Sequence, residues 1–197
     1  MKPLVLASRS PRRQEILRKA AIPFIVAPSH VPEIRRDGED PVGYAERLAR
    51  DKALEVAKDH PQQFVLGADT VVIVEGVTLE KPQDAADAAR MLRLLSGKTH
   101  QVTTAVCVVV PQLRTRNREL RTGSETTFVT MSALTDDDIR GYIATGEPMD
   151  KAGAYAIQGI ASRWISRIQG DYFNVVGLPV ALVCRILEEL RALPKLG

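Results

Sequence analysis

The sequence predicts an α/β fold in which helices surround a mixed β-sheet. Apolar runs rich in β-branched residues alternate along the chain with segments whose apolar residues recur at helical spacing. These runs do not follow a strict strand–helix–strand order, so we expect both parallel and antiparallel pairs of strands. No shift in composition marks a linker, and we therefore expect a single domain over residues 1–197.

The first half of the chain contains two helix starts of the same kind. Ser10-Pro11 and Asp40-Pro41 each place a capping side chain directly before a proline, which is typical of the first turn of a helix. Helical stripes of apolar residues follow both pairs. The apolar stretches at residues 2–7 and 64–74 predict two strands, of which the second is rich in β-branched residues.

The second half of the chain continues this alternation. Helical spacing predicts a helix over residues 88–95 that ends near Gly97, one that starts at Thr135, and a closing helix over 178–193. Further strands are predicted over residues 102–110, 126–131, 155–157 and 164–168.

Composition excludes several classes of protein. Hydrophobic residues make up 45% of the chain and charged residues 26%, which is the balance of a globular protein and not of a disordered or fibrous one. The two cysteines are far apart, which excludes a disulfide scaffold and a cysteine zinc site, and the three scattered histidines do not favour a histidine-rich metal site. The longest uncharged apolar stretch, 99–113, is too short and too polar to span a membrane, and the N-terminus lacks the apolar region of a secretory signal. We therefore expect a cytoplasmic protein.

The basic residues gather in two places, although the net charge is only +3. The first twenty residues hold six basic side chains and a single acidic one. A second cluster, Arg114, Arg116, Arg118 and Arg121, is best interpreted as a solvated face. Aromatic residues do not interleave with either cluster, so the sequence does not favour binding to nucleic acid.

Two arginines begin the helix that Ser10-Pro11 predicts. Arg12 and Arg13 lie in its first turn, where the positive pole of the helix dipole makes cations unfavourable by roughly 0.3–1 kcal/mol. The helix that starts at Thr135 has the favoured arrangement instead, with aspartates in its first turn. A bound phosphate would compensate for the two arginines. Pairing with surface carboxylates is the alternative.

Asp69 interrupts an apolar strand. Aspartate is disfavoured in strands, and a buried carboxylate must be paired or bound to a metal. Asp69 is therefore a candidate metal ligand or general base. The alternative is that it marks the end of the strand or caps a turn.

Two lysines and one small-residue segment are further candidates. Lys52 lies on the apolar stripe of its helix, so it either extends to water or meets an anion in a cleft. Lys81 precedes Pro82, which favours an extended backbone and aims the lysine at a pocket or at solvent. The segment 150–159 holds small residues that allow close approach, and Gln158 can both donate to and accept from a base edge, unless this is an ordinary turn and strand.

Taken together, an anion-binding turn, an acidic strand residue and lysines suit one class of reaction. Nucleotide phosphates are held by arginine and lysine, and a divalent cation neutralises their charge. A carboxylate can then deprotonate the attacking water. The sequence thus indicates a hydrolase that acts on nucleotides.

Five motifs occur in order along most of the chain. They are LASRSPRR at 6–13, GADTV at 67–71, EKP at 80–82, DKAGAY at 150–155 and GDYFNVVGLP at 170–179. In this set the chain resembles the Maf family, also called septum formation inhibitor proteins. The resemblance implies an elongated mixed sheet with flanking helices, similar to inosine triphosphate pyrophosphatases, with a cleft between two lobes. It also implies hydrolysis of nucleoside triphosphates to a monophosphate and pyrophosphate, with water attacking the α-phosphate and with Mg²⁺ or Mn²⁺ as cofactor.

The resemblance also implies roles for individual residues. Asp69 would be the general base, and Glu33 with Asp69 would bind the metal. The residues that would hold the triphosphate are Ser8, Arg13, Lys52 and Lys81. Those that match the subgroup acting on dTTP and UTP are Arg12, Thr70 and Gln158.

Two further alternatives stay open at this level. The protein could remove modified pyrimidine nucleotides, with dTTP and UTP incidental. It could also be a regulatory or nucleic-acid-binding protein linked to septum formation, without catalysis. The family further suggests a homodimer.

Overall fold

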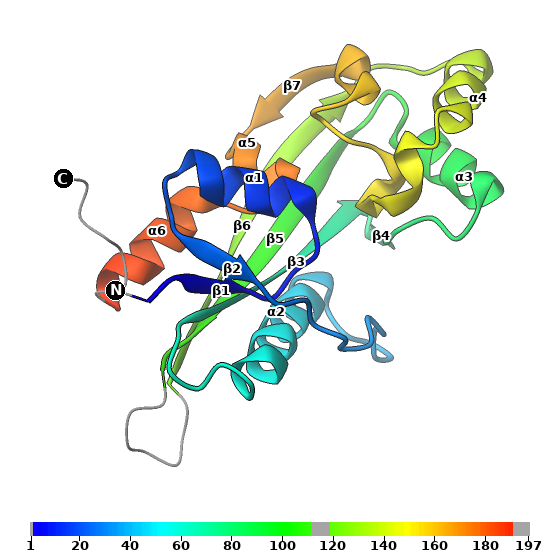
Figure 1. Ribbon diagram of the computed structural model, residues 1–197. Helices are drawn as coiled ribbons and strands as arrows, with labels where there is room; N and C mark the ends of the chain where they lie inside the picture. The colour runs from blue at the N-terminus through cyan, green and yellow to red at the C-terminus, as the bar shows by residue number, and fades with distance from the viewer. Residues whose placement is uncertain (1, 112–118, 191–197) are drawn as a thin grey trace. The chain divides into compact units, whose positions relative to one another are not determined.

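The computed structural model describes residues 2–111 and 119–190. It contains a seven-stranded sheet with the order β2-β1-β3-β5-β6-β7, and β4 pairs with β3 outside this order (Figure 1). The strands are β1 (Leu4–Leu6), β2 (Phe24–Val26), β3 (Val65–Val74), β4 (Val77–Leu79), β5 (Thr99–Val109), β6 (Leu120–Met131) and β7 (Ile165–Gln169). β1 pairs in parallel with β2 and β3, whereas β3–β4 and β6–β7 are antiparallel. The predicted mixed α/β sheet with flanking helices is confirmed.

The helices follow most of the predicted starts. They are α1 (Pro11–Lys19), α2 (Pro41–Ala57), α3 (Ala85–Leu95), α4 (Asp136–Ala144), α5 (Tyr172–Val176) and α6 (Val180–Glu189). Ser10, Asp40 and Thr135 each accept a hydrogen bond from a backbone N–H of the first turn of their helix. Three short 3₁₀ helices, η1 (Glu147–Asp150), η2 (Ala152–Ala154) and η3 (Ile160–Trp164), complete the set. None of the described helices is both long and apolar enough to cross a membrane.

The chain forms two compact units. The first comprises Met1–Asp69, Thr104–Glu125 and Gly177–Gly197, and the second comprises Thr70–Thr103 and Thr126–Val176, within the described residues. Strands β3, β5 and β6 each begin in one unit and end in the other. The single domain expected over residues 1–197 stays a prediction.

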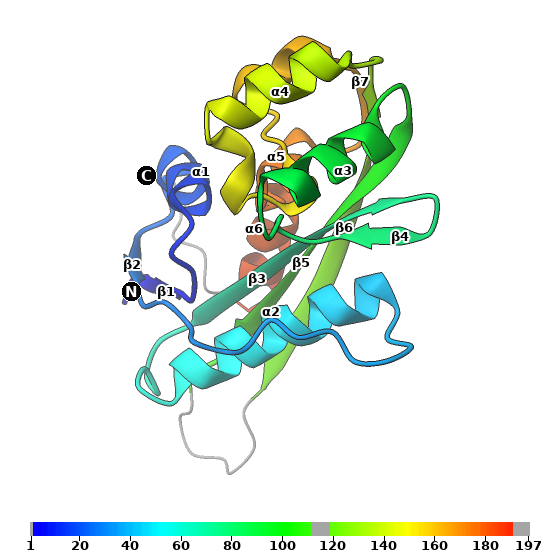
Figure 2. The same cartoon turned by 90° about the vertical axis from the view of Figure 1, so that its right-hand side faces the viewer.

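In the first unit, helices cover both faces of the sheet. Figure 2 shows α2 and α6 on opposite sides of the strands. Two glycines make these contacts close: a Cβ on Gly67 of β3 would meet α2, and one on Gly123 of β6 would meet Leu182 of α6. The apolar stripe of α2 that the sequence predicts is buried, and it includes Leu48 and Ala53.

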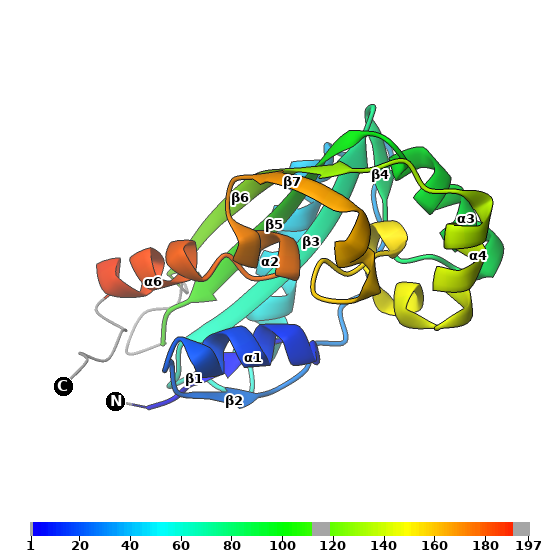
Figure 3. The same ribbon diagram turned by 90° about the horizontal axis from the view of Figure 1, so that it is seen from above.

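In the second unit, a tight hairpin joins β3 to β4. Glu75 and Gly76 both have positive φ, which suits a two-residue turn between antiparallel strands. This hairpin leads directly to the Glu80-Lys81-Pro82 segment. Helices α3 and α4 pack against each other in the same unit (Figure 3).

Some sequence predictions need correction. The strand predicted at 155–157 is wrong: this segment connects η2 to η3, and the hydroxyl of Tyr155 forms a 2.8 Å hydrogen bond with Nε2 of His100. The short elements β2, β4 and α5 were not predicted, because three to five residues give too little periodicity. Of the second basic cluster, Arg114, Arg116 and Arg118 lie outside the described residues, as does the end of the predicted closing helix.

Candidate active site

The site in the first unit depends on how closely α2 approaches β3. A Cβ on Gly67 would lie 2.1 Å from the carbonyl oxygen of Ala49 and 2.9 Å from the nitrogen of Ala53. Only glycine fits at this point of the strand. Because side chains alternate along a strand, Asp69 lies on the same face as Gly67 and is turned toward α2.

Lys52 of α2 meets two carboxylates. Its Nζ donates to Oδ1 of Asp69 at 2.6 Å and to Oε1 of Glu33 at 2.6 Å. The Lys52 side chain is only 9% exposed and that of Asp69 11%, whereas Glu33 is 40% exposed. Of the two interpretations of Lys52, the structure supports the anion partner, because its ammonium group is buried between acidic side chains and does not extend to water.

Burial raises the pKa of Asp69, and the positive charges of Lys52 and Arg13 oppose this rise. A carboxylate with a raised pKa is a stronger base than an ordinary aspartate. Asp69 lies within β3 and is buried, so the alternative in which it ends the strand or caps a turn is wrong.

The turn between β1 and α1 lies beside this pair. Nη1 of Arg13 donates to the carbonyl oxygen of Ala68 at 2.9 Å, and its Nε donates to that of Gly177 at 2.8 Å. Nη1 also donates to Oγ of Ser8 at 3.2 Å, and Ser8 is 8% exposed. Burial lowers the pKa of Arg13, and the charge of Asp69 opposes this effect.

These contacts place Arg13 in the site, and phosphate binding by the two arginines stays a prediction. Arg13 donates to two backbone carbonyls and one hydroxyl, and these bonds fix its guanidinium next to the residue that precedes Asp69. Arg12 follows Ser10-Pro11 in the first turn of α1 and is half-buried. Five predicted residues, Ser8, Arg13, Glu33, Lys52 and Asp69, thus come together in the first unit.

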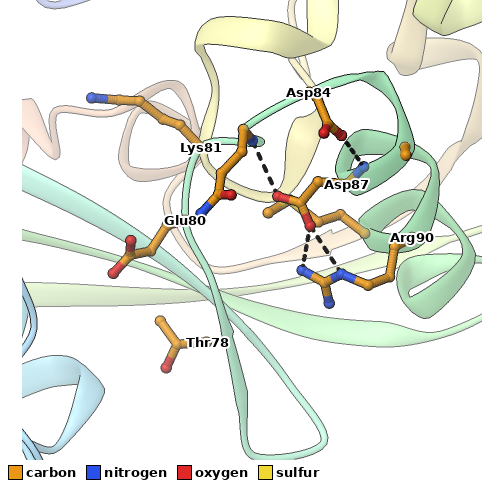
Figure 4. A pocket seen from close by; sticks show the side chains of 9 residues that line it. Thr78, Glu80, Lys81, Asp84, Asp87 and Arg90 are labelled. Carbon is orange, nitrogen blue, oxygen red and sulfur yellow. Dashed lines mark hydrogen bonds and ion pairs between the residues drawn. The ribbon is translucent and has the colours of Figure 1, made fainter.

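Three predicted residues, Thr70, Lys81 and Gln158, belong to the second unit. Lys81 is exposed and lines a pocket of about 530 Å³. Figure 4 shows this pocket, where Asp87 accepts from Nη2 of Arg90 at 2.7 Å. The backbone N–H of Gly153 donates to the carbonyl oxygen of Glu80 at 3.1 Å, which ties the predicted 150–159 segment to the residue before Lys81.

The predicted specificity residues lie at different places in these elements. Thr70 directly follows Asp69 in β3, so the two side chains point to opposite faces of the strand. Thr70 is half-buried, whereas Gln158 is exposed between η2 and η3. Gln158 therefore presents its amide to solvent, where a ligand could reach it.

Glu33 and Asp69 offer the oxygen donors that a divalent metal ion takes. Each carboxylate places one oxygen 2.6 Å from Lys52 Nζ, so the ammonium group holds that point and the metal-binding role of the pair stays a prediction. Mg²⁺ takes oxygen ligands and is commonly held by one or two carboxylates together with phosphate oxygens and water. Within 2–111 and 119–190, no group of three or more His, Cys, Asp or Glu side chains is placed to hold a metal.

Sequence reasoning missed three residues that shape this site. Gly67 stands in the GADTV motif, but a glycine in a strand does not by itself reveal which helix packs on it. Arg47 and Glu55 of α2 hold the loop that carries Glu33. Nothing in their local sequence distinguishes them from exposed helix residues.

Comparison with known proteins places this site in a family. The family model for Maf-like proteins matches residues 3–190. The chain belongs to the Maf family. The expected family membership is confirmed, and it covers both compact units.

Several Maf proteins with assigned names are close relatives. The protein named dTTP/UTP pyrophosphatase from Koribacter versatilis is 57% identical over 186 residues, which covers 94% of this chain and 93% of that protein. The protein of the same name from Escherichia coli O157:H7 is 47% identical, which covers 98% of this chain and 95% of that protein. The one from Bacillus pumilus is 45% identical and covers 98% of this chain and all of its own length. Among solved structures, the Ham1 protein of Staphylococcus aureus matches with a TM-score of 0.47 and 14% identity, over 96% of this chain and all of that one.

Proposed function

We propose that this Maf protein hydrolyses nucleoside triphosphates, dTTP and UTP above all, to the monophosphate and pyrophosphate. The observation that carries the proposal is the buried group in which Lys52 contacts both Asp69 and Glu33 at 2.6 Å. The names of relatives up to 57% identical over nearly the whole chain support the same reaction.

The triphosphate binds at the turn between β1 and α1. Oγ of Ser8 accepts from Ser10 N and Arg13 Nη1, both at 3.2 Å, so its own hydrogen points elsewhere and donates to a phosphate oxygen. The carbonyls of Ala68 and Gly177 hold the Arg13 guanidinium in place, and its positive charge attracts the phosphates. Lys81 supplies a further positive charge.

Asp69 is the general base. Its carboxylate takes a proton from a water molecule, whose oxygen forms a bond to the α-phosphorus. The bond between that phosphorus and the oxygen bridging to the β-phosphate breaks, and pyrophosphate leaves with the bonding electrons. Burial raises the pKa of Asp69 and strengthens it as a base, while the positive charge of Lys52 opposes this rise.

A divalent ion, Mg²⁺ or Mn²⁺, would be held by Glu33 and Asp69 and would neutralise charge on the phosphates. Lys52, which contacts both carboxylates at 2.6 Å, orients them. Arg12, Thr70 and Gln158 select the base, and the amide of Gln158 both donates to and accepts from a pyrimidine edge. The homodimer and the cytoplasmic location expected from the sequence stay predictions.

The test is release of pyrophosphate from a panel of nucleoside triphosphates with Mg²⁺ or Mn²⁺. The panel holds dTTP, UTP, CTP, ATP, 7-methyl-GTP and 5-substituted uridine triphosphates. Asp69→Asn is compared with Asp59→Asn, an exposed aspartate after α2. We expect pyrophosphate from dTTP and UTP, lost in Asp69→Asn and retained in Asp59→Asn.

Other results would change the proposal in defined ways. Faster turnover of the 5-substituted nucleotides would assign the enzyme to removal of modified pyrimidines. Full turnover by Asp69→Asn would remove Asp69 as the base. Release from none of the panel, together with salt-dependent binding to DNA, would favour the regulatory alternative.

A further inference from the structure

Glu33 lies in a connection without helix or strand, yet it makes a specific contact. The connection runs from Ala27 to Asp40, between β2 and α2, and most of its residues are exposed. A segment of this kind holds a side chain in one place only if its backbone is tied to something rigid. Figure 2 shows the connection passing along α2 before it enters that helix.

Glu55 of α2 ties down the first part of this connection. Its Oε2 accepts from the backbone N–H of His30 at 2.9 Å and from the hydroxyl of Ser29. Oγ of Ser29 in turn accepts from the N–H of Val31 at 3.1 Å. These bonds lower the pKa of Glu55, the one from Ser29 most strongly, so Glu55 is ionised at neutral pH.

Arg47 of α2 ties down the second part. Its Nη2 donates to the carbonyl oxygen of Ile34, the residue after Glu33, at 2.9 Å. The same guanidinium forms a bidentate ion pair with Glu39, from Nε to Oε1 at 2.5 Å and from Nη2 to Oε2 at 2.8 Å. Oε2 of Glu39 also accepts from the N–H of Arg36 at 3.0 Å. Arg47 thus fixes both the backbone beside Glu33 and the end of the connection.

The three contacts of this connection come from one helix. Arg47, Lys52 and Glu55 lie within nine residues of α2, or about 12 Å of helix axis at 1.5 Å per residue. The connection meets them in the reverse order, because Ser29 contacts Glu55, Glu33 contacts Lys52 and Ile34 contacts Arg47. It therefore runs antiparallel to α2, with an anchor on each side of Glu33.

We propose that Arg47 and Glu55 are positioning residues that hold the Ala27–Asp40 connection so that the Glu33 carboxylate reaches Lys52. The proposal rests on the proposed function, which places Glu33 in the site. Neither residue touches the reacting atoms. Both act through the backbone on either side of Glu33, and so they control how well the metal and the triphosphate are bound.

The first experiment compares Arg47→Met and Glu55→Ala with Arg50→Met, in the full chain. Arg50 lies on the same helix, its side chain is 49% exposed, and it forms an ion pair with Asp51 at 3.6 Å. For each variant we measure kcat, the KM for dTTP and the Mg²⁺ concentration that gives half-maximal activity. Arg47→Met and Glu55→Ala are expected to raise that concentration or lower kcat roughly 10- to 100-fold. Arg50→Met and Glu55→Gln, whose amide oxygen still accepts both bonds, are expected to stay near the parent.

A double-mutant comparison separates positioning from a general loss of stability. If Arg47 acts through Glu33, then Arg47→Met changes activity strongly in the parent and less than about twofold in a Glu33→Gln background. An equal loss in both backgrounds would overturn the proposal. So would a full effect of Glu55→Gln, because that variant keeps an acceptor at the same place.

Hydrogen exchange supplies a readout that does not depend on activity. The amides of His30 and Arg36 are expected to exchange faster in Glu55→Ala and Arg47→Met respectively, and at parent rates in Arg50→Met. Unchanged exchange at both amides would contradict the anchoring. If the parent enzyme released no pyrophosphate, the proposed function would fail, while exchange would still decide whether these residues hold the connection.

Discussion

Gly67 of β3 lies directly against Ala49 of α2: a Cβ on Gly67 would lie 2.1 Å from the carbonyl oxygen of Ala49. The missing side chain lets α2 rest directly on β3. The same approach brings Lys52 of the helix to Asp69 of the strand, at 2.6 Å. The close packing of backbone against backbone therefore builds the acidic pair with its lysine.

Replacing Gly67 should separate these elements. Gly67→Ala places a methyl group inside contact distance of two backbone atoms of α2, and overpacking of this kind costs roughly 1–3 kcal/mol. We expect the free energy of unfolding, measured by urea denaturation, to fall by that amount. Gly141→Ala is the control, because a Cβ at Gly141 of α4 meets nothing within 4 Å and alanine favours helix. Equal stability of the two variants would refute the close contact.

The ionisation of Asp69 should depend on Lys52. Burial raises the pKa of Asp69 above 3.8, and the Lys52 charge partly offsets this rise. Removal of an opposite charge disfavours the carboxylate, so Lys52→Met should move the pKa of Asp69 further upward. The measurement is an NMR titration of the aspartate carboxyl carbons in the metal-free protein, with Lys58→Met as control. A downward shift in Lys52→Met would contradict the contact.

Arg13 should matter for stability as well as for substrate. Arg13→Ala leaves the carbonyl oxygens of Ala68 and Gly177 without this donor, which costs roughly 1–3 kcal/mol for a buried group. The KM for dTTP should rise in the same variant, because a positive charge is lost at the proposed triphosphate site between β1 and α1. Arg18→Ala, exposed on the same helix, is expected to change neither quantity. A raised KM at unchanged stability would show that the carbonyl contacts contribute nothing.

His100 should make stability fall in mild acid. Burial lowers the pKa of His100 to about 4 from an ordinary 6.5. The folded protein then keeps His100 neutral while the unfolded chain binds a proton, so the free energy of unfolding decreases as the pH falls from 6.5 to 4. Over that range the loss is about 3 kcal/mol.

The matched variant for this prediction is His100→Gln. Glutamine can still bond to the hydroxyl of Tyr155, but it does not titrate. Urea unfolding of both proteins between pH 4 and 7 should give curves that converge toward pH 4. Parallel curves would mean that His100 does not lose a proton on folding.

The sequence by itself determined the features that depend on neighbouring residues. Ser10, Asp40 and Thr135 begin their helices because each side chain bonds to a backbone N–H within three residues. The alternation of apolar residues predicted the mixed sheet in the same way. The motifs likewise identified the family, because they are strings of adjacent residues.

Only the tertiary structure decided what each candidate side chain meets. Lys52 could have extended to water or met an anion, and the choice follows from the packing of α2 on Gly67. Arg47 and Glu55 contact the backbone on either side of Glu33, and both come from a helix that begins after this loop. Tyr155 was expected in a strand, but its hydroxyl contacts His100, fifty-five residues away. Such contacts depend on how whole helices and strands pack together, and burial then shifts the pKa values of the side chains involved. No local sequence pattern predicts either effect.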